Sequence, residues 1–497
     1  MSARIRIGAG LAGLLGISLL LRSTALHGRY WIDEGLSVGI ASFPLDEIPG
    51  ALRQDGSPPL YYLLLGIWTR WLGDGEARTH ALSLGIALLC VPVAFWLANV
   101  IAGRRAAWWA AGVAALLPFL SYYAQETRMY ALAVLLSLLV AGSYGAALVL
   151  GQRRWLVLFV LAGAALLYTH NWGLFLLAGL GIALLPALRR GAVPWRDALL
   201  GFGGIALLYL PWVPTLLDQA AHTGAPWSLS PALRDVPDEL ANVFGGAAGA
   251  MAVVLAGGSG LAAARNRADR SWPVVRALAS GVLIAVVLAF VASTISPAWA
   301  GRYFASFAGP LILLAAIGLA RAGTLGVVAG TLLAILWLSP PTERVNNKSN
   351  VHEVSVAAAE VLEPGDVVVA THPEQVPVAA FYFPGFVRWA DTRGWVPDVR
   401  IFDWREALER YRRANPERVA DRLIAAVEPG NRLVLMQPII RTANWEAPWT
   451  RLVRRRAGEW EELLDADPRL AGGWALPEIG DVDPPKGVRL VVYQRLR

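Results

Sequence analysis

The chain has 497 residues, of which 56% are hydrophobic and 16% are charged. A soluble protein of this length normally has about a quarter of its residues charged, so a wholly soluble fold is excluded. The net charge of +7 would suit a nucleic acid, but arginines beside apolar segments are better explained as topology signals, and we expect no nucleic-acid partner. The single cysteine, Cys90, allows neither a disulfide framework nor a cysteine metal site.

Apolar runs, most of about 17 to 23 residues, follow one another from Ile7 to Leu338, and such a run crosses a hydrocarbon layer of roughly 30 Å as a helix. The first run resembles a signal peptide, but Thr24-Ala25-Leu26 is a poor cleavage site and we expect an uncleaved helix. The sequence predicts a polytopic α-helical membrane protein with about eleven transmembrane helices. These are expected at 7–21, 79–101, 106–122, 129–149, 155–169, 172–187, 197–214, 243–263, 275–295, 304–320 and 323–339.

Basic residues alternate along these runs as the positive-inside rule requires. Arg4 and Arg6 place the N-terminus in the cytoplasm. Later runs return to the cytoplasm at basic clusters, which are Arg104-Arg105, Arg153-Arg154, Arg189-Arg190, Arg265 with Arg267 and Arg270, and Arg321. We therefore predict a multi-pass protein of the cytoplasmic (inner) membrane, with residues 1–340 as its membrane domain and residues 341–497 outside.

The segment from Pro58 to Leu72 lies in the first outer loop, residues 23–75, and is apolar but short. If it crossed the membrane, every later basic cluster would be placed outside. We expect a helix that lies in the outer interface or packs against the bundle. The alternative is that it merges with the following run into one long tilted helix.

Polar and ionisable residues at membrane depth are costly, and they favour a functional interpretation. In the predicted topology they gather at the outer ends of five segments, as Asp33, Glu34, Asp55, Gln125, Glu126, Arg128, His170, Asn171, Arg302 and Tyr303. Asp33 and Glu34 are adjacent acids that can divide the work of general base and of metal or acceptor ligand. The alternative is an interfacial aromatic belt in which Asp33 caps the next helix, and Asp55 likewise fits a simple turn.

The basic and amide side chains have similar pairs of interpretations. Glu126 and Arg128 would not face each other on a regular helix, so a ligand explains Arg128 better than a local ion pair does. His170-Asn171 is either a site pair or an interfacial turn. Arg302 lies in a predicted outer loop, where it either reaches lipid phosphates or binds a substrate phosphate through its planar fork. We favour the second interpretation.

The order and common outer placement of five motifs resemble those of GT-C glycosyltransferases, in particular the bacterial branch related to protein mannosyltransferases, aminoarabinose transferases and RgtA/B/C/D-like proteins. The motifs are Trp31-Ile32-Asp33-Glu34, Asp55-Gly56-Ser57-Pro58-Pro59-Leu60-Tyr61-Tyr62, Gln125-Glu126-Thr127-Arg128-Met129-Tyr130, Thr169-His170 and Arg302-Tyr303. Related sequences often have histidine before the proline pair. This chain has Ser57 there, so any role of that histidine is absent.

The resemblance implies transfer of a sugar from a polyprenyl-phosphate donor to a glycan, lipid or protein acceptor at the outer face, with Asp33 as the base. An inverting transfer needs a carboxylate to take the acceptor proton and a cation to stabilise the leaving phosphate, here Arg302 with Arg128 as a second candidate. Glu34 is the second catalytic candidate. Substrate binding is expected from Asp55, Tyr61, Gln125, Glu126, Arg128, His170, Asn171, Arg302 and Tyr303.

No cofactor is required by this chemistry, and the sequence contains neither a P-loop nor a convincing Rossmann fingerprint. A divalent cation held by Asp33, Glu34 and Glu126 stays open. Two other classes of protein also stay open: a transporter or flippase of lipid or sugar, although ionisable residues at mid-membrane and inverted repeats are not evident, and a non-catalytic envelope-assembly protein.

Residues 341–497 predict an α/β extracytoplasmic domain. Strands are expected at Asp366–Ala370, Arg432–Met436 and Val488–Tyr493, and Trp404–Val427 predicts a helix broken at Asn415-Pro416. The many tryptophans would suit stacking on an acceptor or wall polymer. The alternative is a packing domain in which they are buried.

Overall fold

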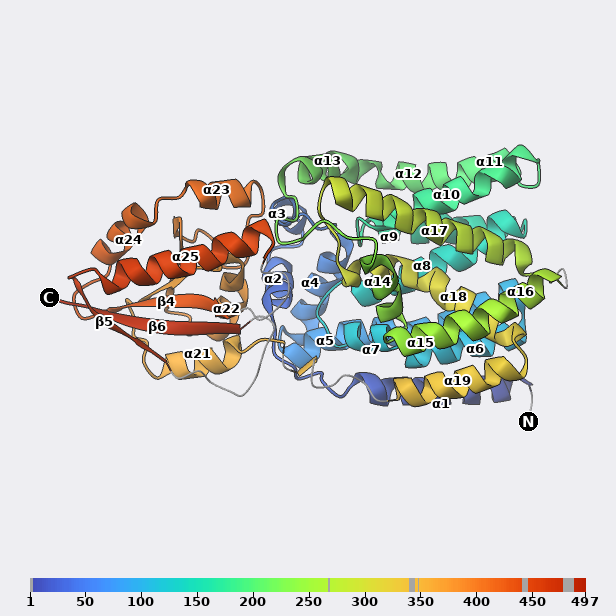
Figure 1. Cartoon of the computed structure of the whole chain (residues 1–497), viewed down its shortest axis with the longest axis horizontal. Coiled ribbons are helices and arrows are strands. Elements are labelled where there is room, and N and C mark those ends of the chain that lie inside the picture. The colour runs from blue at the N-terminus through green and yellow to red at the C-terminus, as the bar shows by residue number, and fades with distance from the viewer. Residues whose placement is uncertain (1–2, 267–268, 339–344, 347, 440–445, 477–486) are drawn as a thin grey trace.

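A computed structural model describes the chain except for residues 1–2, 267–268, 339–344, 347, 440–445 and 477–486. A long helical bundle and a smaller α/β domain lie side by side along the longest axis, and the two termini lie at opposite ends of the molecule (Figure 1). The predicted domain boundary at residue 340 falls outside the described residues.

The bundle follows the predicted apolar runs. Its elements are α1 (Ala3–Arg22), α5 (Glu76–Ala102), α6 (Arg104–Leu116), α7 (Pro118–Tyr123), α8 (Tyr130–Tyr144), η1 (Gly145–Val149), η2 (Arg153–Trp155), α9 (Leu156–Leu167), α10 (Gly173–Arg189), α11 (Trp195–Ala198), η3 (Leu199–Gly203), α12 (Gly204–Tyr209), η4 (Leu210–Trp212), α13 (Val213–His222), α14 (Asp235–Val243), α15 (Ala247–Ala252), η5 (Val253–Gly257), α16 (Gly258–Asn266), α17 (Trp272–Ile295), η6 (Gly301–Phe304), α18 (Ala305–Arg321) and α19 (Thr324–Trp337). Each predicted crossing overlaps one of these helices or a series of them.

Within the described residues, seven helical stretches are long and apolar enough to cross a membrane: Arg4–Arg22, Glu76–Ala102, Tyr130–Val149, Trp195–His222, Ala247–Arg265, Trp272–Ile295 and Gly301–Arg321. Gly173–Arg189 and Thr324–Trp337 are shorter apolar helices. The run predicted at 106–122 is split into α6 and α7, because Leu117 precedes Pro118 and is held in an extended conformation with ψ 118°. The chain is therefore a multi-pass membrane protein, as predicted.

Three short helices form the connection between α1 and α5: α2 (Ile32–Ala41), α3 (Ile48–Asp55) and α4 (Leu60–Leu72). Gly73 ends α4 with φ 88°, and α5 begins three residues later at Glu76. The alternative of one long helix through this region is wrong, because a left-handed glycine separates the two helices. All three short helices lie where the bundle meets the α/β domain (Figure 1).

The described part of the C-terminal region has a six-stranded mixed sheet in the order β3-β2-β1-β4-β6-β5. Its strands are β1 (Val367–Ala370), β2 (Arg388–Asp391), β3 (Gly394–Trp395), β4 (Arg432–Ile439), β5 (Leu470–Ala475) and β6 (Gly487–Arg495), and its helices are α21 (Val351–Ala359), η7 (Pro373–Gln375), α22 (Val376–Tyr382), α23 (Ala407–Arg413), α24 (Pro416–Ala425) and α25 (Pro448–Asp465). β1 is parallel to β2 and β4, and the other pairs are antiparallel. The three predicted strands and the helix break before Pro416 are confirmed.

Both faces of this sheet are covered, because alternate strand residues point to opposite sides. Val368 of β1 packs in the core under α21 and α22, whereas its neighbours Val367 and Val369 pack in the core under α24 and α25. Four described tryptophans of the domain are buried, Trp389, Trp404, Trp449 and Trp460, while Trp395 and Trp474 are exposed. Most of these tryptophans therefore serve packing rather than an open sugar-stacking surface.

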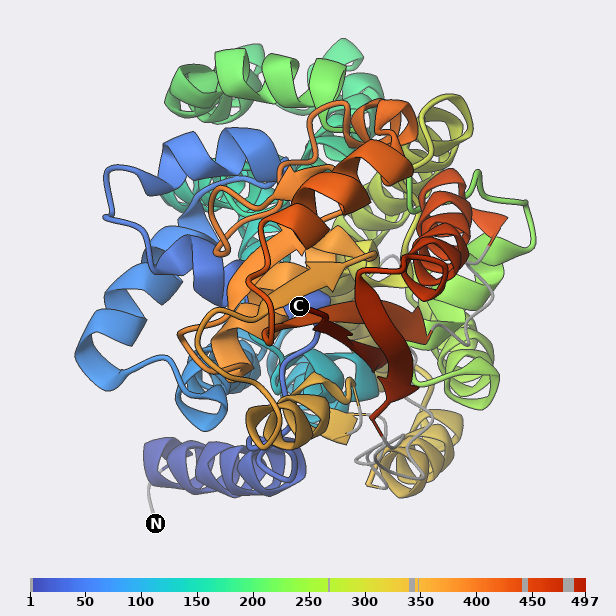
Figure 2. The same ribbon diagram turned by 90° about the vertical axis from the view of Figure 1, so that its left-hand side faces the viewer.

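Helix α2 is held between the two regions. A Cβ atom at Gly35 would lie 2.4 Å from the Val378 Cβ, and one at Gly39 would lie 2.1 Å from the carbonyl oxygen of Arg400. Only glycine allows the C-terminal domain to approach this closely. The sheet domain therefore lies over the end of the bundle (Figure 2), and this contact fixes the helix that carries Asp33 and Glu34.

Candidate active site

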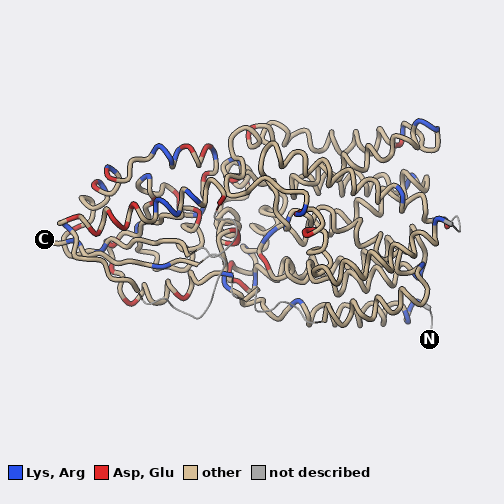
Figure 3. The backbone as a smooth tube through the Cα atoms, in the orientation of Figure 1, with Lys and Arg blue, Asp and Glu red and all other residues tan. Residues whose placement is uncertain are grey.

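The predicted site residues meet at the end of the bundle that faces the C-terminal domain. They come from the first turn of α2, the turn before α4, the irregular segment 124–129, the loop 168–172 and η6. Figure 3 shows charged residues of both signs where the bundle meets the C-terminal domain, few charges along the middle of the bundle, and a second, mostly basic group at its far end. Charged residues of both signs therefore meet at this end of the bundle.

Asp33 lies between two arginines. Its Oδ2 is 3.7 Å from Nη2 of Arg302, and the two side chains are 17% and 21% exposed. Nη1 of Arg128 donates to the carbonyl oxygen of Asp33 at 3.3 Å, to Ser37 Oγ at 3.0 Å and to the Tyr62 hydroxyl at 3.1 Å. The first turn of a helix is a favourable place for a carboxylate. Asp33 is thus an ionisable group in loose contact with a cation, within reach of solvent.

The Arg302 guanidinium is surrounded by aromatic rings. Its Cζ lies 4.9 Å from the ring centre of Trp227, 5.6 Å from that of Tyr303 and 5.9 Å from that of Trp31. The Nε atoms of Arg302 and Arg128 are buried and have no hydrogen-bond partner in the part of the chain that the structure describes. Two guanidinium groups with donors left over form a site that an anion with several oxygens, such as a phosphate, would satisfy.

Asp55 ends α3 beside the same arginines. It is partly buried, and its carboxylate accepts hydrogen bonds from the side chain and backbone of Ser57. Burial raises the pKa of Asp55 above its usual range, the charge of Arg128 opposes that shift, and the charge of Asp33 adds to it. Ser57, which stands where related sequences often have histidine, therefore supports this second carboxylate.

Glu34 has a different environment from its neighbour Asp33. It is fully buried, and its Oε1 accepts from the backbone nitrogen of Thr127 at 2.8 Å and lies 2.6 Å from His80 Nε2. Its Oε2 accepts from Lys348 Nζ at 2.6 Å. The charges of Lys348 and His80 outweigh burial and lower the pKa of Glu34 to about 2. Such a carboxylate stays ionised and is fully engaged by the protein itself.

Gln125 and Glu126 connect this region to the rest of the site. Gln125 Oε1 accepts from the backbone nitrogen of Ala25 at 2.6 Å, so Gln125 fastens the end of α1 to segment 124–129. Glu126 Oε1 accepts from Trp31 Nε1 at 2.8 Å, while its buried Oε2 has no partner among the described residues. Burial and the charge of Glu34 raise the pKa of Glu126. Glu126 is the more readily protonated of these two buried acids.

His170 and Asn171 fill the opposite side of the site. His170 Nδ1 accepts from the backbone nitrogen of Trp172 at 3.1 Å, and its ring lies 4.9 Å from that of Tyr303. Burial, with the charges of Arg128 and Arg302, lowers the pKa of His170 to about 3, so the ring is neutral. Asn171 Nδ2 donates to the carbonyl oxygen of Gly56 at 3.3 Å, which ties this loop to the turn before α4.

Tyr61 and Tyr62 are both fully buried and point to different partners. The Tyr61 hydroxyl lies 3.3 Å from Ser83 Oγ, whereas the Tyr62 hydroxyl accepts from Arg128. On a helix, successive residues lie about 100° apart, so one motif tyrosine faces Arg128 and the other faces α5. The sequence predicts a binding role for Tyr61, and the structure places the neighbouring Tyr62 hydroxyl against Arg128.

Three further residues of the site were missed: His80, Lys348 and Trp227. His80 lies inside an apolar helix, where an ionisable side chain was itself a signal. Lys348 is one of only two lysines in the chain, but it lies 314 residues after Glu34, so only the tertiary structure pairs them. Trp227 lies in the loop after α13 and packs over Arg302 without any motif of its own.

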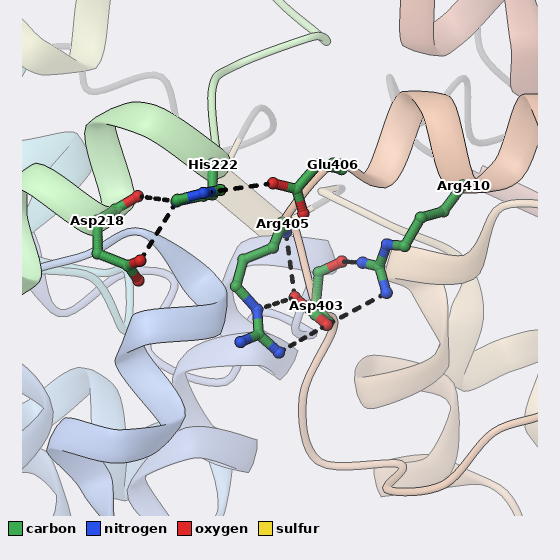
Figure 4. Close-up of a pocket in the computed structure, with 6 residues that line it drawn as sticks. All are labelled: Asp218, His222, Asp403, Arg405, Glu406 and Arg410. Carbon is green, nitrogen blue, oxygen red and sulfur yellow. Dashed lines mark hydrogen bonds and ion pairs between the residues drawn. The ribbon is translucent and has the colours of Figure 1, made fainter.

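A separate polar cavity of about 320 Å³ lies between the end of α13 and the C-terminal domain (Figure 4). It is lined by Asp218, His222, Asp403, Arg405, Glu406 and Arg410. These side chains pair with one another, for example Arg405 Nε with Asp403 Oδ1 at 2.9 Å. None of the predicted site residues lines it. Partly exposed pairs of this kind contribute little stability, and we assign this cavity no ligand.

Neither a protein-family model nor a curated protein matches the chain. Among solved structures, ArnT from Cupriavidus metallidurans bound to undecaprenyl phosphate is similar over 99% of this chain and 98% of that one, with a TM-score of 0.63 and 14% identity. The apo state of the same ArnT is similar over 88% of this chain and 93% of that one, with a TM-score of 0.59 and 16% identity. The apo oligosaccharyltransferase of Archaeoglobus fulgidus is similar over 90% of this chain and 72% of that one, with a TM-score of 0.53 and 13% identity.

The similarity to ArnT, an aminoarabinose transferase, extends over the helical bundle and the C-terminal domain together. The resemblance inferred from the five motifs is confirmed at the level of the fold. This chain has the GT-C fold of membrane glycosyltransferases, with a C-terminal α/β domain beside it.

Proposed function

We propose that the protein is a membrane glycosyltransferase that moves a sugar from a polyprenyl-phosphate donor to an acceptor hydroxyl, with inversion, at the outer face of the cytoplasmic membrane. The observation that carries this proposal is the placement of Asp33 beside Arg302 and Arg128 at one end of an apolar bundle. A base and two cations at that position match a donor whose phosphate lies at the membrane surface and whose chain lies in lipid.

In the proposed reaction, Asp33 takes the proton of the acceptor hydroxyl as the oxygen attacks the anomeric carbon. A new carbon–oxygen bond forms, the bond from the anomeric carbon to the phosphate oxygen breaks, and its electron pair stays on the phosphate. Arg302 and Arg128 bind that phosphate as its charge grows. The products are the glycosylated acceptor and polyprenyl phosphate. Similarity to a transferase whose structure contains undecaprenyl phosphate supports this choice of donor.

The other predicted residues have supporting roles in this proposal. We assign Asp55 and Asn171 to binding of the acceptor, and Tyr62 orients Arg128. Gln125 and Tyr61 maintain the packing around the site through their contacts with Ala25 and Ser83. The Tyr303 ring packs against Arg302, and the neutral His170 ring packs against Tyr303. The acceptor is a glycan, a lipid or a protein of the cell envelope.

Incubation of the purified protein with labelled polyprenyl-phosphate sugars and candidate acceptors tests the proposal. Label should move to an acceptor in the wild-type protein and not in Asp33→Asn. A transporter or flippase would instead move the intact labelled lipid across a proteoliposome membrane without releasing polyprenyl phosphate. If label crosses the membrane but never leaves the lipid, the transferase proposal is wrong.

We also propose an inside N-terminus and an outside C-terminal domain, with the domain boundary near residue 340. Single cysteines at the exposed positions Arg105, Arg190 and Arg413 test the orientation with an impermeant thiol reagent. Only the cysteine at 413 should label from outside intact cells. The native Cys90 is buried and serves as the unlabelled background. If the cysteines at 105 and 190 label from outside and the cysteine at 413 does not, the proposed orientation is wrong.

A further inference from the structure

Both oxygens of Glu34 are occupied by groups of this chain. Oε1 receives the Thr127 backbone N–H and faces His80 Nε2, and Oε2 receives Lys348 Nζ. His80 Nδ1 in turn lies 2.7 Å from the carbonyl oxygen of Leu26, which can only accept. With an acceptor at each ring nitrogen, His80 forms both contacts as an imidazolium. Glu34 is therefore held between two cations of the protein.

Lys348 reaches this position from the segment that joins α19 to the C-terminal domain. Its side chain is 4% exposed, and besides Glu34 its ammonium donates to the carbonyl oxygen of Gln125 at 3.4 Å. Only two of the 44 basic residues of the chain are lysines. An ammonium is a compact point charge, whereas a guanidinium is a wide planar fork. A lysine in a chain that otherwise uses arginine fits a place where a small cation is needed.

A divalent cation does not fit these residues. The sequence left open a cation held by Asp33, Glu34 and Glu126, but Glu34 Oε2 is bonded to Lys348 and Asp33 Oδ2 faces Arg302. Among the described residues, no three histidine, cysteine or acidic side chains are grouped so that they could hold a metal ion. Carboxylate and carbonyl oxygens are the ligands that Mg²⁺ and Mn²⁺ prefer, and here Lys348 takes one of each.

We propose that the Lys348 ammonium occupies the cation position of this site, so that the transferase works without a divalent cation and Lys348 is a positioning residue. This inference rests on the proposed function and deepens it. Lys348 binds α2 through Glu34 and segment 124–129 through Gln125, the two elements that carry Asp33 and Arg128. It also lies close enough to Glu126 for its charge to lower the pKa of that acid against burial. The C-terminal segment thereby holds the catalytic elements in register.

The first test uses the unmodified protein. Turnover of labelled donor should be unchanged after EDTA treatment and dialysis, and added Mn²⁺ should neither raise the rate nor shift the melting temperature. Loss of turnover in EDTA that Mn²⁺ restores would overturn the inference. The melting temperature needs no substrate, so a specific rise on adding stoichiometric Mn²⁺ to the wild-type protein would overturn it even if no donor were ever turned over.

The second test compares Lys348→Ala with the wild-type protein. Removing the ammonium frees Glu34 Oε2 and the Gln125 carbonyl oxygen, so Mn²⁺ should raise the melting temperature of the variant and not that of the wild type. An equal response of the two proteins would show that Lys348 does not hold the cation position. Arg413→Ala, at a basic side chain that is 77% exposed, is the matched control and should respond as the wild type does.

The third test concerns turnover. Lys348→Met should lose roughly 10- to 100-fold in kcat with little change in the KM for the donor, the range typical of a residue that orients a site through another side chain. The pH dependence of its melting temperature should shift toward higher pH, because removal of a positive charge raises the pKa of Glu126. Full turnover with an unchanged pH dependence would overturn the inference. The double variant Lys348→Met/Glu34→Gln removes both charges and gives a folded comparison if the single variant is unstable.

Discussion

Asp33 and Glu34 are adjacent in the sequence and stand in opposite electrostatic situations. Asp33 is partly exposed and its carboxylate lies 3.7 Å from Arg302, whereas Glu34 is fully buried and lies 2.6 Å from both His80 and Lys348. A helix turns by about 100° per residue, so neighbours on α2 face different sides of the molecule. We therefore propose that the loosely paired Asp33 takes part in proton transfer and that the tightly paired Glu34 holds the structure.

The largest expected effect is on turnover in Asp33→Asn. The amide is nearly isosteric but cannot accept the acceptor proton, so kcat should fall by roughly 10²–10⁴-fold, the range typical for a general base. Donor binding should change little, because the two arginines remain. A labelled-donor binding assay beside the turnover assay separates these outcomes. Near-normal turnover would remove Asp33 from the mechanism and make Asp55 the next carboxylate to test.

Glu34→Gln should instead affect stability. Loss of this buried charge leaves the Lys348 ammonium and the His80 ring without their counter-ion, and breaking a buried pair in this way costs about 3–5 kcal/mol. The melting temperature in detergent should fall clearly below that of Asp33→Asn measured in parallel. If the two variants melt together, the contrast drawn between the adjacent acids is wrong.

Arg302→Lys tests the anion side of the site. The ammonium keeps the charge but lacks the planar fork and the stacking on Trp227, so both donor affinity and rate should fall. Loss of one charged hydrogen bond of about 1.5–3 kcal/mol corresponds to roughly 10- to 100-fold in affinity. Arg388, which also stacks on a tryptophan but lies in β2, offers the control Arg388→Lys. Unchanged donor affinity in Arg302→Lys would assign the phosphate to Arg128 alone.

The smallest expected effect distinguishes Glu126 from Glu34 by pH. The pKa of Glu126 is raised in the folded state, so the folded protein holds that proton more tightly, and stability from this group is lost as the pH rises above its usual value of 4.5. The pKa of Glu34 is lowered, so its contribution is lost as the pH falls. Between pH 5 and 8, the melting temperature of Glu126→Gln should rise relative to that of the wild type as the pH rises. A fall in the melting temperature of the variant relative to the wild type over this range would contradict the raised pKa of Glu126.

Much of the fold followed from local chemistry. Apolar length located the membrane helices, and short β-rich runs located β1, β4 and β6. These features are predictable because each depends on residues that are close together in the chain. The breaks were less predictable. Gly73 separates α4 from α5, and Pro118 shortens α6, and either residue would be compatible with a continuous or kinked helix in another context.

The sequence by itself also determined which residue types meet at one end of the bundle: two acids on α2, Arg128 on segment 124–129 and Arg302 on η6. Only the tertiary structure decided which acid pairs with which cation. Lys348, more than 300 residues from Glu34, neutralises one acid and leaves the other to face Arg302. The physical reason is that a buried carboxylate must find a cation wherever the fold supplies one, and no local pattern in a sequence records which distant segment will bring it.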